Sequence, residues 1–262
     1  MKEESIQIEY AGRRLLIATK HRRNGSDWVV FLHGMACAKE SFDEVFNDEL
    51  ADNYSLLTFD FLGFGGSDKP EDFAYSLEDH AKIAKLVIRH FAPDSVTVVG
   101  HSMGGAIGLI LVRELEKLVS FVNVEGNLIP EDAGIVSRQT ADQPESEFVE
   151  NGFNNFLEGL KTSDEPAFRS WANWYENSSP IAVHRSGMSL VIWSDSGKLM
   201  PYFNDLKSKA FVYGDKTDVS LLLPKFLGVD VYSIPDSAHF MMLDNPTAFY
   251  AAIRNHLVKI NK

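Results

Sequence analysis

Cysteine is almost absent from this sequence, since Cys37 is the only thiol among its 262 residues. A single thiol excludes a disulfide within the chain and a zinc site built from several thiolates. No apolar run comes near the roughly 18 residues of a membrane-spanning helix, and residues 1–5 are too polar to begin a signal peptide. These absences predict a soluble protein of a reducing compartment, the cytoplasm, with no membrane partner.

Positive charge is scarce as well, because 25 lysines and arginines face 37 aspartates and glutamates, for a net charge of −12. Nucleic acids and anionic membranes carry negative charge and bind basic protein surfaces, so the net negative charge disfavours both as partners. The glycine-rich stretch after Gly63 has Asp68 where a G-x-G-x-x-G loop needs its last glycine, and neither G-K-[ST] nor H-E-x-x-H occurs. We therefore expect no cofactor and no metal ion, and a small molecule as the partner.

The hydrophobic residues of the first half follow two patterns. Residues 6–10 alternate apolar and polar side chains, as half-buried strands do, and residues 14–18 continue as a second short strand after a turn at Gly12. We expect these two strands to be antiparallel and to lie at the edge of the sheet. Continuous apolar runs, typical of strands buried on both faces, follow at residues 28–32, 55–59, 96–99 and 121–124. Segments with helical periodicity lie between these runs, at residues 41–50, 77–91 and 103–118. This alternation predicts a parallel sheet covered by helices on both faces.

The alternation stops after Glu125 and returns only near the end of the chain. Two further strands are predicted at residues 210–213 and 229–234, followed by a closing helix at residues 247–257. Residues 130–205 contain no run typical of a buried strand, and they hold three of the four tryptophans: Trp171, Trp174 and Trp193. We interpret this stretch as a helical insert. The predicted division is therefore a core of residues 1–129 and 206–262 and a cap of residues 130–205.

The strongest chemical signal is the run from Gly100 to Gly104, which spells G-x-S-x-G with Ser102 at its centre. It lies between a predicted buried strand and a predicted helix, the context that this motif requires. The sharp turn lifts the serine hydroxyl to the carboxyl edge of the sheet, and the glycines let neighbouring backbone pass close by. The motif predicts Ser102 as a nucleophile.

Four motifs at successive strand ends together resemble the capped, single-domain proteins of the α/β-hydrolase fold. They are His33-Gly34, Asp60 to Ser67, Gly100 to Gly104 and Ser237 to Phe240. The resemblance covers nearly the whole chain. It implies a mostly parallel eight-stranded sheet flanked by helices, with a helical cap inserted after the sixth strand.

The resemblance also implies an oxyanion hole and a base. The oxyanion hole needs two backbone N–H groups, which the family takes from the positions of Met35 and Met103. The base is a histidine that follows the nucleophile, and His184, His239 and His256 all do so. His184 lies in the insert, and His256 lies in the closing helix, where an exposed or core-edge position is expected. His239 follows the last predicted strand, where the family's base belongs.

The acid of the predicted triad has three candidates. The family usually places it after the seventh strand, where Thr217 stands here, with Asp218 one residue late and Asp215 two residues early. The other family location follows the sixth strand and holds Glu125. A carboxylate that closes an apolar strand is costly to bury without a partner. We therefore prefer Glu125, keep Asp218 as the alternative acid and rank Asp215 third.

These residues predict a serine hydrolase that cleaves small carboxylic esters through an acyl-enzyme, with no cofactor. Aromatic side chains of the cap would suit an apolar pocket for the acyl or alcohol group, or would only form the packing core of the cap. One alternative is another reaction of this fold, by a C–C bond hydrolase, a perhydrolase or a lyase. Another alternative is a ligand sensor with little turnover. The sequence leaves the choice between a monomer and a homodimer open.

Overall fold

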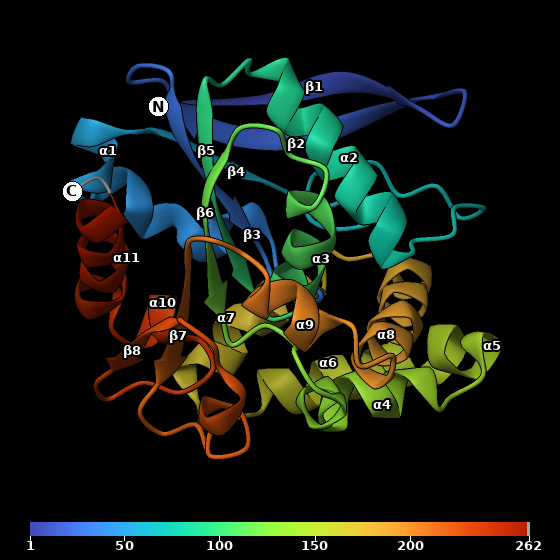
Figure 1. Cartoon of the computed structure of the whole chain (residues 1–262). Helices are drawn as coiled ribbons and strands as arrows, with labels where there is room; N and C mark the ends of the chain where they lie inside the picture. The colour runs from blue at the N-terminus through green and yellow to red at the C-terminus, as the bar shows by residue number, and fades with distance from the viewer. Residues whose placement is uncertain (261–262) are drawn as a thin grey trace.

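Eight strands form the central sheet of the computed structural model, which describes residues 1–260 (Figure 1). The strands are β1 (Lys2–Tyr10), β2 (Arg13–Arg22), β3 (Asp27–Leu32), β4 (Ser55–Phe59), β5 (Ser95–His101), β6 (Leu118–Val124), β7 (Lys209–Gly214) and β8 (Asp230–Ile234). Their order across the sheet is β1-β2-β4-β3-β5-β6-β7-β8. Strands β1 and β2 are antiparallel to their neighbours, and all other pairs are parallel. The predicted mostly parallel eight-stranded sheet is confirmed.

The sequence patterns explain where each strand lies. In β3 and β4 every residue except Asp27 is buried, as continuous apolar runs predict for central strands. The edge hairpin β1–β2 alternates instead, and its turn has positive φ at both Ala11 (50°) and Gly12 (74°). Two central residues with positive φ are the geometry that suits the right-handed twist of a two-residue hairpin.

Helices cover both faces of the sheet (Figure 1). On one side lie α2 (Leu77–His90) and α3 (Met103–Val112), which pack against each other. On the other side lie the 3₁₀ segment η1 (Lys39–Asn47), α1 (Leu50–Asn53), α10 (Met241–Asp244) and α11 (Pro246–Ile260). Helix α2 begins where the sequence predicts, since the Ser76 hydroxyl accepts the N–H of Asp79 as an N-cap.

Two predicted helices are wrong in detail. The α-helix predicted over residues 41–50 is instead the 3₁₀ segment η1 followed by the short α1, because buried Phe42 has a non-helical φ of −115°. The helix predicted over residues 103–118 ends at Val112. The main-chain oxygen of Lys117 already accepts the N–H of Val96, so the chain has turned into the pairing of β6 with β5.

Between β6 and β7 the described residues form helices and connecting loops only. They are η2 (Pro130–Ala133), α4 (Ile135–Ala141), α5 (Glu145–Glu147), η3 (Phe148–Gly152), α6 (Phe153–Lys161), α7 (Pro166–Tyr175), α8 (Pro180–Asp195) and α9 (Leu199–Asn204). This helical insert lies beyond the carboxyl ends of β5 and β6, along the bottom of Figure 1. Arg185 ties it to the core, because its guanidinium binds Glu145 within the insert and the main-chain oxygens of Glu71 and Phe73. The division of the chain at residues 130 and 205 stays a prediction.

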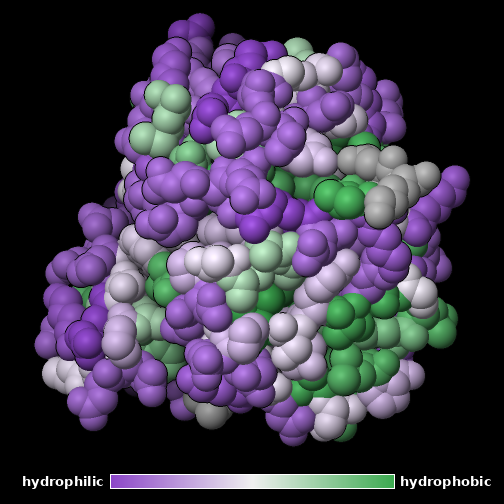
Figure 2. All heavy atoms as spheres, turned by 90° about the vertical axis from the view of Figure 1, so that its left-hand side faces the viewer, coloured by the Kyte–Doolittle hydropathy of each residue, from purple (hydrophilic) through white to green (hydrophobic). Residues whose placement is uncertain are grey.

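The surface of the molecule is hydrophilic over much of its area and hydrophobic in places. Figure 2 shows a mostly hydrophilic face, with a hydrophobic patch at its lower right. Exposed leucines of the β7–β8 connection include Leu221, Leu223 and Leu227. Within residues 1–260, no helix combines the length and the hydrophobicity that crossing a bilayer demands.

Candidate active site

Ser102 forms the single-residue turn between β5 and α3. Its backbone has φ 52° and ψ −122°, a conformation that is strained for a residue with a side chain. The Ser102 N–H donates to the main-chain oxygen of Val124 at 3.0 Å, which holds the turn against the end of β6. A Cβ at Gly104 would lie 2.3 Å from the oxygen of Leu32, and one at Gly100 would lie 2.5 Å from the oxygen of Gly104. The two glycines of the motif are therefore required by packing.

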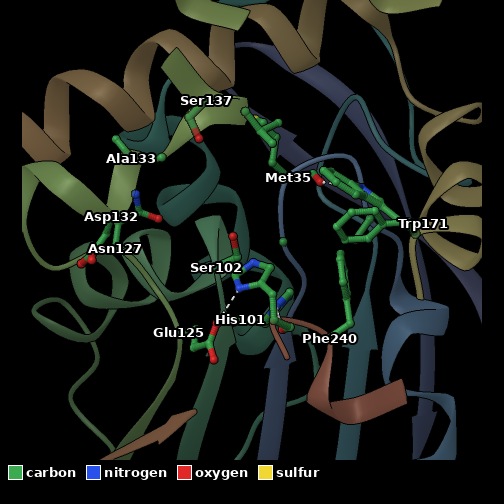
Figure 3. A pocket seen from close by; sticks show the side chains of 16 residues that line it. Met35, His101, Ser102, Glu125, Asn127, Asp132, Ala133, Ser137, Trp171 and Phe240 are labelled. Carbon is green, nitrogen blue, oxygen red and sulfur yellow. Dashed lines mark hydrogen bonds and ion pairs between the residues drawn. The ribbon is translucent and has the colours of Figure 1, made fainter. Parts of the chain in front are cut away.

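His239 and Glu125 form a close pair near this turn. The Nδ1 atom of His239 lies 2.7 Å from Oε2 of Glu125, whose side chain is only 6% exposed. Glu125 directly follows β6, and His239 lies in the loop after β8. The dashed line in Figure 3 that ends on Glu125 marks this contact, beside the side chain of Ser102.

Glu125 is held as a carboxylate by three donors. Burial favours the neutral acid, but hydrogen bonds from His239, from the Gly214 N–H and from the Thr217 hydroxyl outweigh it and lower the pKa of Glu125. The Gly214 N–H donates to Oε1 at 2.9 Å. Thr217 stands at the position where the family resemblance implies the acid, and its hydroxyl interacts with the carboxylate of Glu125 instead.

The other two candidate acids lie elsewhere. Asp218 is exposed and accepts the N–H of Ser220 at 2.9 Å, which closes a local turn. Asp215 is also exposed and accepts the N–H of Ser237 at 3.1 Å, in the loop that leads to His239. The structure therefore brings Glu125, and neither aspartate, to the imidazole of His239.

His101 fixes the backbone of the His239 loop. Burial lowers the pKa of His101 well below the usual histidine range, so its ring is neutral. Its Nε2 lies 2.9 Å from the main-chain oxygen of His239, and because a carbonyl only accepts, Nε2 carries the proton. The two rings also pack with their centroids 4.6 Å apart. His101, the residue directly before Ser102, thus positions His239.

The turn after β3 lies against Ser102. A Cβ added to Gly34 would meet the Cβ of Ser102 at 3.2 Å, so the backbone from Gly34 to Met35 passes beside the serine. Met103 is the first residue of α3, and the first N–H groups of a helix have no acceptor within it. Both backbone donors predicted for an oxyanion hole therefore flank Ser102.

A cavity of about 250 Å³ opens at Ser102. Figure 3 shows Asn127, Asp132, Ala133 and Ser137 on one side of Ser102, and Met35, Trp171 and Phe240 on the other. The first side is largely polar and the second is apolar. Ser137 and Trp171 come from α4 and α7, so the insert supplies walls that no motif in the sequence marks, apart from its richness in aromatic residues.

A second Ser-His-Asp chain of hydrogen bonds lies elsewhere in the molecule. Ser120 Oγ lies 2.7 Å from Nε2 of His256, whose Nδ1 lies 3.1 Å from Oδ2 of Asp230. Ser120 is 0% exposed and His256 is 1% exposed, so His256 is not exposed; it lies at the edge of the core, where it binds the partly exposed Asp230. No substrate can reach a hydroxyl buried in this way, so this Ser-His-Asp chain of hydrogen bonds is not an active site. Among the described residues, no cluster of three or more histidine, cysteine, aspartate or glutamate side chains could hold a metal ion.

Sequence comparisons match part of the chain. A family model described as alpha/beta hydrolase fold matches residues 27–134. The probable lysophospholipase BODYGUARD 4 of Arabidopsis thaliana is 41% identical over 101 residues, which are 38% of this chain and 24% of that protein. The uncharacterized hydrolase YugF of Bacillus subtilis (strain 168) is 33% identical over 104 residues, 39% of this chain and 38% of that protein. The matched part thus spans well under half of these curated relatives.

Solved structures match the chain over its full length. A thermophilic esterase from Thermogutta terrifontis superposes with a TM-score of 0.79 at 16% identity, covering 100% of both chains. A bromoperoxidase from Bacillus anthracis gives 0.79 at 15% identity, covering 97% of this chain and 99% of that one. The N-acyl homoserine lactonase AidH gives 0.79 at 15% identity, covering 99% and 98%. Identities this low show a shared fold and leave the substrate open.

Proposed function

This chain is a protein of the α/β-hydrolase fold, and from that premise we propose that it is a serine hydrolase that cleaves small carboxylic esters through an acyl-enzyme. The observation that carries the proposal is the 2.7 Å contact of His239 with buried Glu125, beside Ser102 at the cavity. A carboxylate that binds Nδ1–H of a histidine leaves Nε2 free to act as a base. The Arabidopsis and Bacillus relatives and the esterase neighbour are hydrolases by name, which supports the same class of reaction.

The first half of the proposed reaction forms the acyl-enzyme. Ser102 Oγ attacks the ester carbonyl carbon while Nε2 of His239 accepts the hydroxyl proton. The negative charge that develops on the carbonyl oxygen is stabilised by the N–H groups of Met35 and Met103. The C–O bond then breaks, His239 returns the proton to the leaving alkoxide, and the alcohol departs. Glu125 stabilises the imidazolium at each stage.

The second half releases the acid. A water molecule attacks the acyl carbon as His239 accepts its proton, the same two N–H groups stabilise the oxyanion, and the bond to Ser102 breaks as the proton returns to the serine oxygen. All of these groups belong to the protein, so the cycle as written uses no cofactor. The helical insert would act as the cap that keeps other water from the site.

The cavity volume supports a small substrate. Ligand pockets commonly measure about 300–1,000 Å³, whereas this one measures about 250 Å³. A cavity of roughly 150 Å³ holds a benzene molecule, so this one has room for a short acyl chain or a small alcohol. A long-chain lipid ester would extend beyond it.

Hydrolysis of p-nitrophenyl acetate, butyrate and octanoate by the wild type and by Ser102→Ala tests the proposal. We expect turnover that is faster for the two short esters, and a loss of at least about 10³-fold in kcat for the variant. Ester turnover that survives in Ser102→Ala would contradict the proposal. A wild type that cleaves β-diketones but not esters, or that is stabilised by ligands without turnover, would favour the alternatives.

A further inference from the structure

Trp171 connects the helical insert to the backbone beside Ser102. It lies on α7, is 8% exposed, and its indole N–H donates to the main-chain oxygen of Met35 at 3.1 Å (Figure 3). The two residues are 136 positions apart in the sequence. The ring of Trp171 also packs on that of Phe240, with centroids 5.5 Å apart, and Phe240 directly follows His239. One side chain of the insert therefore contacts both the turn that carries Met35 and the segment that directly follows His239.

The turn that carries Met35 has a conformation that needs support. The Cys37 N–H donates to the oxygen of Gly34 at 3.2 Å, and Ala36 has a φ of +51° whereas Met35 does not have a positive φ. A four-residue turn with positive φ at its third residue is of type II, a position that favours glycine. Rotation of the central peptide, between Met35 and Ala36, would convert the turn to type I and relieve the alanine. That rotation would also turn the Met35 oxygen away from Trp171 and change ψ of Met35, the residue whose N–H, in the preceding peptide, is assigned to the oxyanion.

We propose that Trp171 is a positioning residue, whose indole N–H holds the Met35 oxygen and so keeps the oxyanion turn in the conformation that catalysis uses. The inference rests on the proposed function, because it assigns the Met35 N–H to the oxyanion. Through this hydrogen bond, the packing of α7 on the core would determine whether the oxyanion hole is formed. With α7 displaced, the turn loses the bond that opposes rotation of its central peptide.

The inference separates a positioning role from a role as a cavity wall. Oxyanion stabilisation acts in the transition state, so its loss lowers kcat for every ester. A side chain that only lines the cavity would alter KM, and would alter it differently for acyl groups of different length. The ratio of kcat and KM effects across a series of esters therefore tells the two roles apart.

Trp171→Phe keeps an aromatic ring at this position and removes the N–H. We expect kcat to fall about five- to tenfold for both p-nitrophenyl acetate and butyrate, with KM changed by less than about twofold. The matched control is Trp174→Phe, one turn along α7 and outside the cavity at Ser102, which should leave both constants unchanged. The melting temperatures of the wild type and of both variants show whether a change in kcat comes from loss of folded protein.

Adding Ala36→Gly to Trp171→Phe provides a second test. Glycine accepts positive φ without strain, so the double variant should recover part of the lost kcat. An unchanged kcat in Trp171→Phe, or a fall with no recovery in the double variant, would overturn the inference. A wild type without ester turnover would contradict the proposed function itself, which keeps the two failures distinct.

Discussion

Replacing Glu125 by glutamine removes a single charge at the centre of the proposed triad. Besides the Thr217 hydroxyl, two N–H donors converge on the carboxylate: Nδ1 of His239 on Oε2 at 2.7 Å and the Gly214 N–H on Oε1 at 2.9 Å. A glutamine side chain has one acceptor oxygen, so its amide NH₂ must face one of these donors. In neither orientation of the amide do both N–H donors keep an acceptor oxygen.

The two orientations set the size of the effect. If the NH₂ group faces His239, the ring must accept at Nδ1, which moves the proton to Nε2 and removes the base. If it faces Gly214, a buried N–H loses its partner at a cost of about 1–3 kcal/mol, and the imidazolium loses its counter-charge. The same exchange in a serine protease triad lowers kcat about 10⁴-fold. We expect a loss of about 10³- to 10⁴-fold, or roughly 4–5.5 kcal/mol in activation free energy.

The assay is kcat/KM for p-nitrophenyl butyrate, measured on the wild type, Glu125→Gln and Asp218→Asn. Asp218→Asn changes an exposed carboxylate whose partner is Ser220, in its own turn, so activity should stay within about twofold. Circular dichroism checks that each variant is folded. If the asparagine variant lost activity and the glutamine variant kept it, the assignment of Glu125 as the acid would be refuted.

Three further outcomes follow from the packing and the charges. Ser120→Ala should leave ester hydrolysis unchanged while lowering stability by about 1–2 kcal/mol in urea unfolding, because Nε2 of the buried His256 loses its partner. Loss of activity in this variant would instead give the Ser120–His256 hydrogen bond a role in catalysis. Gly104→Ala should fail to fold, because its Cβ would lie 2.3 Å from a main-chain oxygen. Gly159→Ala has no neighbour within 4 Å of the added Cβ and should raise the free energy of unfolding by about 0.5–1 kcal/mol. Melting temperatures of the two variants check both expectations. Because the folded-state pKa of Glu125 lies below its ordinary value of 4.5, the ionised group stabilises the fold above that pH, and this contribution is lost as the pH falls through the lowered pKa. The unfolding free energies of the wild type and Glu125→Gln should therefore differ more near about pH 7 than near about pH 3.

The sequence was informative wherever chemistry follows a strand end. Continuous apolar runs predict the central strands, and the carboxyl ends of parallel strands meet at one edge of the sheet. Ser102 and His239 could therefore be named before their spatial relation was known. The acid could not be chosen in this way, because Glu125 and Asp218 follow neighbouring strands, β6 and β7. What separates them is the local path of the β7 loop, which turns Thr217 toward the carboxylate of Glu125 and leaves Asp218 in solvent.

The contacts of the helical insert were harder to predict from the sequence than the acid. Its aromatic composition and its lack of strand runs predict helices, but they do not say which side chain turns toward the core. The bond from Trp171 to Met35 depends on how α7 docks, and no local pattern encodes a contact between residues 136 positions apart. The 3₁₀ segment around Phe42 is a similar case, since the burial of that ring against Phe31 outweighs the helical periodicity of its neighbours.

Intact-mass analysis after treatment with a fluorophosphonate tests the central claim most directly, because this reagent reports an activated serine without presuming a substrate. We predict a single covalent adduct on the wild type and none on Ser102→Ala. An adduct of equal yield on the folded Ser102→Ala variant, or no adduct on the folded wild type, would contradict the assignment of Ser102 as the nucleophile of a working triad.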